Sequence, residues 1–177
     1  MSKLFSPITI RGEEMRNRVF VAPMCQYSSA TEDGRCSGWH TVHYGTRAVG
    51  GAGLVMLEAS AVRPDGRISP QDLGLWNDSH VEAMGPVVDA IVSNGSVPAI
   101  QLAHAGRKAG HTKPWEGGHQ LNSSNGGWDN IAPSPIAFQE DWDAPREMTL
   151  EDIGQVIDDF ANSARLAVNA GMKVIEL

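Results

Sequence analysis

The chain has 177 residues, of which 41% are hydrophobic and 20% are charged, and its formal net charge at pH 7 is −7. This balance predicts one soluble globular unit with a sizeable core. It excludes the basic surface that nucleic-acid binding requires, and no apolar run is long enough to span a membrane. Because the chain has only two cysteines, Cys25 and Cys36, and shows no secretory leader, we expect a reduced, cytoplasmic protein without a disulfide.

The first half of the chain predicts an N-terminal β-hairpin, then a helix and a strand. Two short β-like segments stand on either side of the polar turn Arg11–Glu14, and the helix is stopped by Gly50–Gly51. A continuous apolar run of strand length follows those glycines. The expected elements are strands at Ile8–Ile10 and Arg18–Val21, a helix at Trp39–Val49 and a strand at Leu54–Leu57.

The second half predicts two amphipathic helices and two further strands. Capping boxes at Ser79–Glu82 and Thr149–Asp152 mark the helix starts, and Gly95 and Gly171 mark the ends. Apolar residues recur at helical spacing, at Val81, Met84, Val87, Val88, Ile91 and Val92 in the first helix and at Ile153, Val156, Ile157, Phe160, Ala164 and Val168 in the second. Strands are expected at Pro98–Leu102 and Val174–Leu177, and a long loop rich in Gly, Asn, Trp and Pro at 104–147.

Apolar strands that alternate with helices predict an α/β fold with a parallel sheet covered by helices. Two architectures fit this order, the doubly wound sheet and the (β/α)8 TIM barrel. Gly50, Gly51 and Gly53 follow a helix and precede a strand, so they predict a tight turn and not the phosphate loop of a dinucleotide-binding fold. Four such strands make about half of a barrel. We therefore expect residues 1–177 to be the N-terminal half of one larger domain, ending in its fourth strand.

Polar residues gather where the predicted strands end. Cys25 and Tyr27 follow the first strand, Glu58–Ser60 follow the second, and the third ends in Gln101–Lys108. Because ligands in parallel β/α folds bind at the carboxyl ends of the strands, these residues are candidates for one site.

Each candidate also has a structural interpretation. A lone cysteine is often a small core residue, and the Gln101 amide could be satisfied by backbone groups. Lys108 and Arg107 could be solvated loop charges. A metal held by His40 and His43, or by His104, His111 and His119, is not expected, because no carboxylate or thiol stands at suitable spacing. Cys25 with His104 as its base would instead suit a non-redox enzyme.

Together these stretches resemble the Old Yellow Enzyme family of flavin-dependent ene reductases, in particular its bacterial branch of YqjM-type and xenobiotic reductases. The resemblance spans essentially the whole chain, and its most specific stretch is Gln101–Lys108. It implies a TIM barrel that holds FMN at its C-terminal mouth, of which this chain is the N-terminal half. The other stretches that carry it are 4–10, 16–18, 22–27, 58–62, 66–68, 131–138 and 146–149.

The resemblance implies roles for individual residues. Cys25 matches the cysteine beside the flavin N5 and O4 edge, where a weak S–H donor tunes the reduced flavin. Ala59 matches a small residue whose backbone meets the ring, and Gln101 matches an amide at its pyrimidine edge. Tyr27 matches a phenol that holds the substrate oxygen, and Lys108 matches a substrate-contacting residue at the mouth. Ala22, Pro23, Met24 and Cys25 match the family's segment after the first strand, which lines the flavin.

The implied activity is reduction, by hydride from FMN, of the C=C bond of α,β-unsaturated carbonyls or of related nitro compounds. NADPH or NADH would reduce the flavin, and the full-length protein would form homo-oligomers. The loop, with Trp115 and Trp128, would form a mobile lid over the mouth. The family's phosphate site, anion-holding pair and proton donor lie beyond the matched stretch, so we expect the 177-residue chain alone to be inactive. The alternatives are a non-catalytic half-barrel and a non-redox TIM-barrel enzyme.

Overall fold

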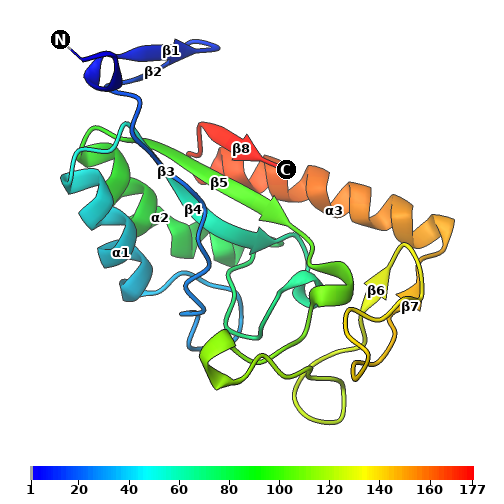
Figure 1. Ribbon diagram of the computed structural model, residues 1–177. Helices are drawn as coiled ribbons and strands as arrows, with labels where there is room; N and C mark the ends of the chain where they lie inside the picture. Colours follow the sequence, from blue (N-terminus) through cyan, green and yellow to red (C-terminus); the bar gives the residue numbers. More distant parts are fainter. Residues whose placement is uncertain (1) are drawn as a thin grey trace.

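The computed structural model describes residues 2–177 and contains a four-stranded parallel sheet backed by three helices (Figure 1). The strands lie side by side in chain order, and residues of all three helices pack into one core on a single face of the sheet. A doubly wound sheet carries helices on both faces, so this arrangement is that of a barrel wall. The strands are β3 (Phe20–Val21), β4 (Leu54–Ala61), β5 (Val97–Ala103) and β8 (Val174–Glu176), and the helices are α1 (Gly38–Val49), α2 (Asp78–Ser93) and α3 (Leu150–Asn169).

The main core lies between the sheet and the helices. Alternate strand residues, such as Val55, Leu57 and Ile100, face the helices and are fully buried. The residues between them, including Leu54 and Met56, face the opposite side, which we call the inner face, and form a much smaller cluster. The two faces therefore differ in packing although both are apolar.

The N-terminal hairpin is built differently from the prediction. It pairs β1 (Ile8–Ile10) with β2 (Glu13–Met15), so Arg18–Val21 is not the second strand of the hairpin. A strand is present there over Phe20–Val21, but it pairs with β4 in the parallel sheet. Arg11 and Gly12 have φ angles of 50° and 91°, which make the two-residue turn that matches strand twist. The turn is thus only two residues long. The hairpin lies at the end where the sheet strands begin (Figure 1), and Met15 packs with the inner-face residues.

The ends of the helices test the capping residues that the sequence predicted. The capping box at Thr149 and Asp152 is confirmed for α3. In α2 the predicted box is wrong, because Asn77 accepts the backbone N–H of Ser79 and the helix begins at Asp78. An Asn cap at that position satisfies the same free amides that a serine would satisfy. The helix that ends at Gly50 is confirmed.

The predicted apolar face of α3 differs from the face that is buried. Ser163, Leu166 and Ala167, none of them in the predicted set, are buried, whereas the predicted Ile157 is 63% exposed and Val168 is 62% exposed. The predicted Phe160 and Ala164 are partly buried against the core. The strand beside the helix, β8, has three residues, and within residues 2–177 it has a single neighbour, β5. The first turns of α3 therefore have no sheet beneath them.

The long loop between β5 and α3 contains short ordered pieces. They are the 3₁₀ turns η3 (Gly106–Lys108) and η4 (Pro114–Glu116) and the paired strands β6 (Ile131–Ala132) and β7 (Arg146–Glu147). Figure 1 shows this loop at the carboxyl end of the sheet. It lies at the edge where the polar residues were predicted.

Candidate functional site

A β-bulge in β4 builds one side of the site. Leu57 pairs with Ile100 and Ala59 pairs with Gln101, so Glu58 is an extra residue opposite β5. A bulge of this kind redirects side chains and is common beside active sites. The strand continues to Ala61, so the expectation that Glu58–Ser60 follow the strand is wrong.

Glu58 points into the layer occupied by α1 and is fully buried. The Tyr44 hydroxyl donates to Glu58 Oε1 at 3.0 Å, and the Glu58 backbone N–H donates to the Tyr44 oxygen at 2.9 Å. The Gln26 backbone N–H donates to Glu58 Oε2 at 2.6 Å. Burial raises the Glu58 pKa to about 7, although the bonds to Gln26, Tyr44 and Tyr27 lower it. The carboxyl group thus joins the helix layer to the loop that follows β3.

That loop carries Cys25 and Tyr27 side by side. The Ala59 backbone amide hydrogen-bonds to the Cys25 sulfur, and burial raises the Cys25 pKa to about 12. Partial burial, then the neighbouring Cys25, raises the Tyr27 pKa to about 12. Tyr27 has a φ of 52°, a conformation that side chains rarely adopt and that clusters at functional sites. At neutral pH the site therefore presents a neutral thiol and a neutral phenol.

Three side chains form a row across the inner face: Ala59 and Gln101, which were predicted site residues, and Glu176, which was not. The sheet register places Ala59, Gln101 and Glu176 next to one another on β4, β5 and β8. Gln101 Nε2 donates to Glu176 Oε1 at 2.5 Å, and no hydrogen bond to Gln101 Oε1 is found within residues 2–177. The row offers a small side chain, an amide with a free acceptor and a carboxylate.

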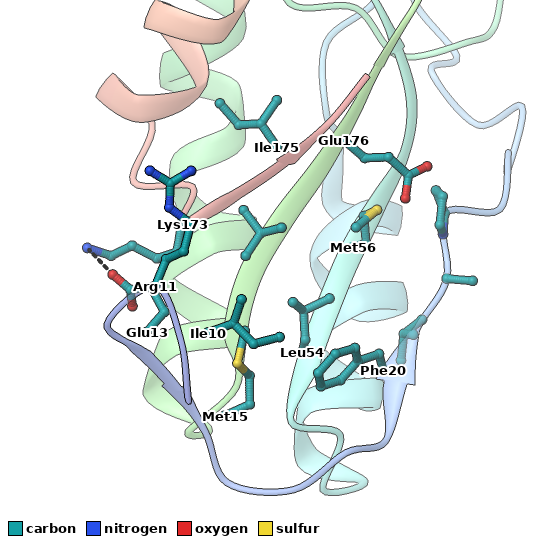
Figure 2. A pocket seen from close by; sticks show the side chains of 14 residues that line it. Ile10, Arg11, Glu13, Met15, Phe20, Leu54, Met56, Lys173, Ile175 and Glu176 are labelled. Carbon is teal, nitrogen blue, oxygen red and sulfur yellow. Dashed lines mark ion pairs between the residues drawn. The ribbon is translucent and has the colours of Figure 1, made fainter. Parts of the chain in front are cut away.

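A groove of about 670 Å³ runs along the inner face below this row. Figure 2 shows Leu54 and Met56 on its floor, and the hairpin with Met15 at its lower end. Ala22, Pro23 and Glu176 also line the groove. Met24, predicted with them, does not line the groove and is 52% exposed. Of the residues in the row, only Glu176 lines the groove.

The loop between β5 and α3 reaches the rim at one aromatic contact. The Trp115 ring lies edge-on to Tyr27, with centroids 5.5 Å apart, as expected for a residue that covers the mouth. Trp128 lies instead under the Arg67 guanidinium, 5.0 Å from it. Lys108 is exposed and its Nζ lies 4.9 Å from the centre of the Phe138 ring. The mobility of this segment and the substrate role of Lys108 stay predictions.

Three charged residues are buried, which the sequence interpretation did not predict. Glu58, Asp72 and Arg67 are each at most 9% exposed. Burial raises the Asp72 pKa to about 6, against bonds donated by Ser69 and Ile68. Arg67 donates to three backbone carbonyls and lies between Trp76 and Trp128. The signal available for Glu58 was a single carboxylate inside an apolar strand, a position that charged groups occupy only when paired.

The geometry does not support a non-redox enzyme in which His104 serves as the base for Cys25. The charged groups that act on His104 are Arg63, Asp65 and Asp159, whereas those that act on Cys25 are Asp72 and Glu58. The two side chains therefore have different surroundings. A thiol with a raised pKa is also a poor nucleophile.

Histidines do not assemble a cluster in this structure. His43 stacks on Trp39 with ring centroids 5.8 Å apart, while His40 faces Glu58. Residues 2–177 contain no group of three or more histidines, cysteines and carboxylates arranged to hold a metal ion. No helix among them combines the length and apolar character that a bilayer crossing requires.

Comparison with known proteins identifies the family. The family model described as "NADH:flavin oxidoreductase / NADH oxidase family" matches residues 3–177. The chain is 45% identical over 174 residues to an NADPH dehydrogenase of Geobacillus, covering 98% of this chain and 47% of that protein. It is 43% identical over 175 residues to the NADPH dehydrogenase of Bacillus subtilis, covering 99% of this chain and 47% of that protein.

A solved structure supports the same assignment. The structure of the old yellow enzyme homologue from Zymomonas mobilis matches with a TM-score of 0.81 at 28% identity, over 98% of this chain and 47% of that chain. The chain therefore spans about half the length of the relatives it matches, and the predicted barrel fold is confirmed over that half. The chain belongs to the NADH:flavin oxidoreductase / NADH oxidase family, the flavin-dependent oxidoreductases that include Old Yellow Enzyme.

Proposed function

We propose that the protein to which these residues belong is an FMN-dependent NAD(P)H oxidoreductase that reduces the C=C bond of α,β-unsaturated carbonyls or related nitro compounds. The observation that carries the proposal is the row at the carboxyl end of the sheet. It places Ala59 and Gln101 side by side, and the Ala59 backbone amide donates a hydrogen bond to the Cys25 sulfur. FMN would supply the redox chemistry, accepting hydride from NADPH or NADH and passing it to the activated alkene.

The side chains present fit the edge of a flavin ring. Ala59 leaves room for a planar ring, whereas a longer side chain would fill the space above the strand. The Gln101 amide can accept through Oε1 and donate through Nε2, which suits a ring edge that alternates C=O and N–H groups. Glu176 holds Nε2 in this structure, so that donor would have to be shared or released. Ala22 and Pro23 would approach the ring from the loop.

Cys25 and Tyr27 would act on the cofactor and on the substrate. A neutral S–H group is a weak donor, and its placement beside the ring would shift the stability of the reduced form. A neutral Tyr27 hydroxyl can donate to the carbonyl or nitro oxygen of a substrate and so increase the electrophilicity of the alkene. Lys108, 4.9 Å from the Phe138 ring centre on the outer loop, would meet substrate only after that loop closes.

Purified protein tests the proposal directly. We would load it with FMN, desalt it and record the visible spectrum and the intact mass on the same sample. A retained flavin band together with an enone-dependent oxidation of NADPH supports the proposal. A colourless protein of the length of the relatives contradicts it. A colourless 177-residue product would show that half a barrel cannot retain the cofactor, as expected for a chain without the rest of the family fold.

Gln101→Ala sharpens the same test. In protein that retains FMN, this change removes the only side-chain amide of the row and should weaken FMN binding by about tenfold or more, the usual cost of a lost buried hydrogen bond. Gln155→Ala is the matched control, since Gln155 lies on α3 and bonds only to Asp159. Equal FMN affinity in both variants would place the flavin elsewhere.

A second function remains open for the isolated chain, that of a non-catalytic half-barrel whose rim is a relic. Such a chain would be colourless at any FMN concentration tested and would not oxidise NADPH.

A further inference from the structure

The turn that carries Cys25 and Tyr27 lies outside regular secondary structure. Its backbone contains no helix or strand between Val21 and Gly38, and Tyr27 sits in the left-handed region. A tyrosine in that conformation is strained, so surrounding groups must hold it. The two backbone amides at the centre of the turn, those of Gln26 and Tyr27, both bond to the Glu58 carboxylate.

The other partners of Glu58 are also donors. Tyr44 donates its hydroxyl to Oε1. The Ser37 backbone N–H donates to His40 Nδ1, so the proton of the neutral imidazole is on Nε2. His40 Nε2 lies 3.6 Å from Glu58 Oε1 and has no other partner. A set made only of donors suits a carboxylate, whereas a protonated acid would direct its own O–H at one of them.

We propose that Glu58 is a positioning residue of the candidate site: its ionised carboxylate, anchored on α1 by Tyr44, holds the turn that presents Cys25 and Tyr27. The importance of this turn to flavin chemistry rests on the proposed function, but its positioning by Glu58 can be measured without flavin. Protonation of Glu58 converts an acceptor oxygen into a donor and loosens the turn. The midpoint falls near neutral pH, because burial raises the Glu58 pKa to about 7.

Several groups share the space around this carboxyl and bear on its charge. His40 is held neutral, since burial lowers its pKa to about 4. The thiols of Cys25 and Cys36 both have pKa values raised to about 12, mainly by burial, and stay neutral. Asp72, with a pKa raised to about 6, titrates just below Glu58. The titratable groups around Glu58 are thus Tyr44 and His40 from α1, Cys25, Tyr27 and Cys36 from the β3–α1 loop, and Asp72 from the loop before α2.

Amide hydrogen exchange tests the proposal on the purified protein. We would measure protection at Gln26 and Tyr27, relative to intrinsic exchange rates, between pH 5.5 and 8.5. In the unmodified protein protection at both amides falls as the pH drops through about 7. In Glu58→Gln protection at pH 8 is lower by about tenfold or more, the usual effect of losing a charge-assisted bond, and the pH dependence disappears. Tyr44→Phe gives an intermediate loss and keeps the pH dependence.

A matched control and the contrary outcomes define the test. Glu82→Gln alters an exposed carboxylate on α2 and should leave protection at both turn amides unchanged. Unchanged protection in Glu58→Gln, or an equal loss at the turn and in β4 and β5, overturns the proposal. If Glu58→Gln does not fold, the pH profile of the unmodified protein decides: absence of a midpoint between pH 6 and 8 at Gln26 and Tyr27 overturns it. A protein that binds no flavin yet shows this profile contradicts the proposed function alone.

Discussion

The two faces of the same four strands differ in how they are packed. The helix-side face is closed by α1, α2 and α3 around fully buried residues such as Leu57 and Ile100. The inner face carries one small cluster around Met56 and opens into the groove shown in Figure 2. Within residues 2–177, most of the folding free energy should therefore come from the helix side.

Leu57→Ala and Met56→Ala compare the two faces at neighbouring positions of β4. Leu57→Ala should lower the free energy of unfolding by about 2 to 5 kcal/mol, because it leaves a cavity in a closed core. Met56→Ala borders the groove, where neighbours can relax, and should cost less than about 2 kcal/mol. Urea denaturation measures both. Equal losses would show that the inner face is packed as tightly as the helix side.

Gly53→Ala probes the amino end of the sheet, where both faces meet the preceding loop. A Cβ at Gly53 would collide with the backbone oxygen of Asn17, so the variant should lose about 1 to 3 kcal/mol. Gly85→Ala is the control, because that position in α2 opens onto empty space and should gain up to about 1 kcal/mol from helix propensity. A neutral Gly53→Ala would mean that the loop moves freely.

The pH dependence of stability tests Glu58, the buried carboxyl group where the helix layer meets the rim. Glu58 has a pKa raised from 4.5 to about 7, so the folded state keeps a proton that the unfolded chain has lost across that range. Its contribution is full below about pH 4.5 and is lost as the pH rises through about 7, with a slope of up to about 1.4 kcal/mol per pH unit.

Subtracting the unfolding free energy of Glu58→Gln at each pH separates this slope from other titrations. His40, whose pKa is lowered to about 4, acts in the opposite sense and loses stability as the pH falls below about 6.5. Acid thus stabilises the fold through Glu58 while it loosens the turn that Glu58 holds. A difference curve that is flat from pH 4.5 to 7 would show that Glu58 is not buried as described.

Lys108→Ala should have the smallest effect. Its cation–π contact with Phe138 is exposed, so the loss in unfolding free energy should be below about 1 kcal/mol. Lys113→Ala is the matched control, since Lys113 lies 6.0 Å from the Trp115 ring centre and pairs with Glu116. In protein with activity, a raised KM for Lys108→Ala alone would support its substrate role. A stability loss above about 2 kcal/mol would assign it to the fold instead.

Local signals predicted the elements but not all of their boundaries. The capping box at Thr149 and the glycine stop after α1 held, because they depend on atoms a few residues apart. The hairpin failed at Arg18–Val21, because those residues lead into the parallel sheet, where Phe20 pairs with Leu54. The exposed residues of α3, such as Ile157, are apolar in sequence, but burial depends on what lies beneath the helix.

The sequence by itself determined the alternation of strands and helices, the family, and the placement of Cys25, Tyr27, Ala59 and Gln101 toward the carboxyl edge of the sheet. Periodicity, caps and motifs are short-range properties, so they can be seen in one dimension. Only the tertiary structure decided that the helices share one face, that a bulge turns Glu58 into the helix layer, and that Glu176 bonds to Gln101. These features depend on strand register and burial, which arise when residues distant in sequence pack together.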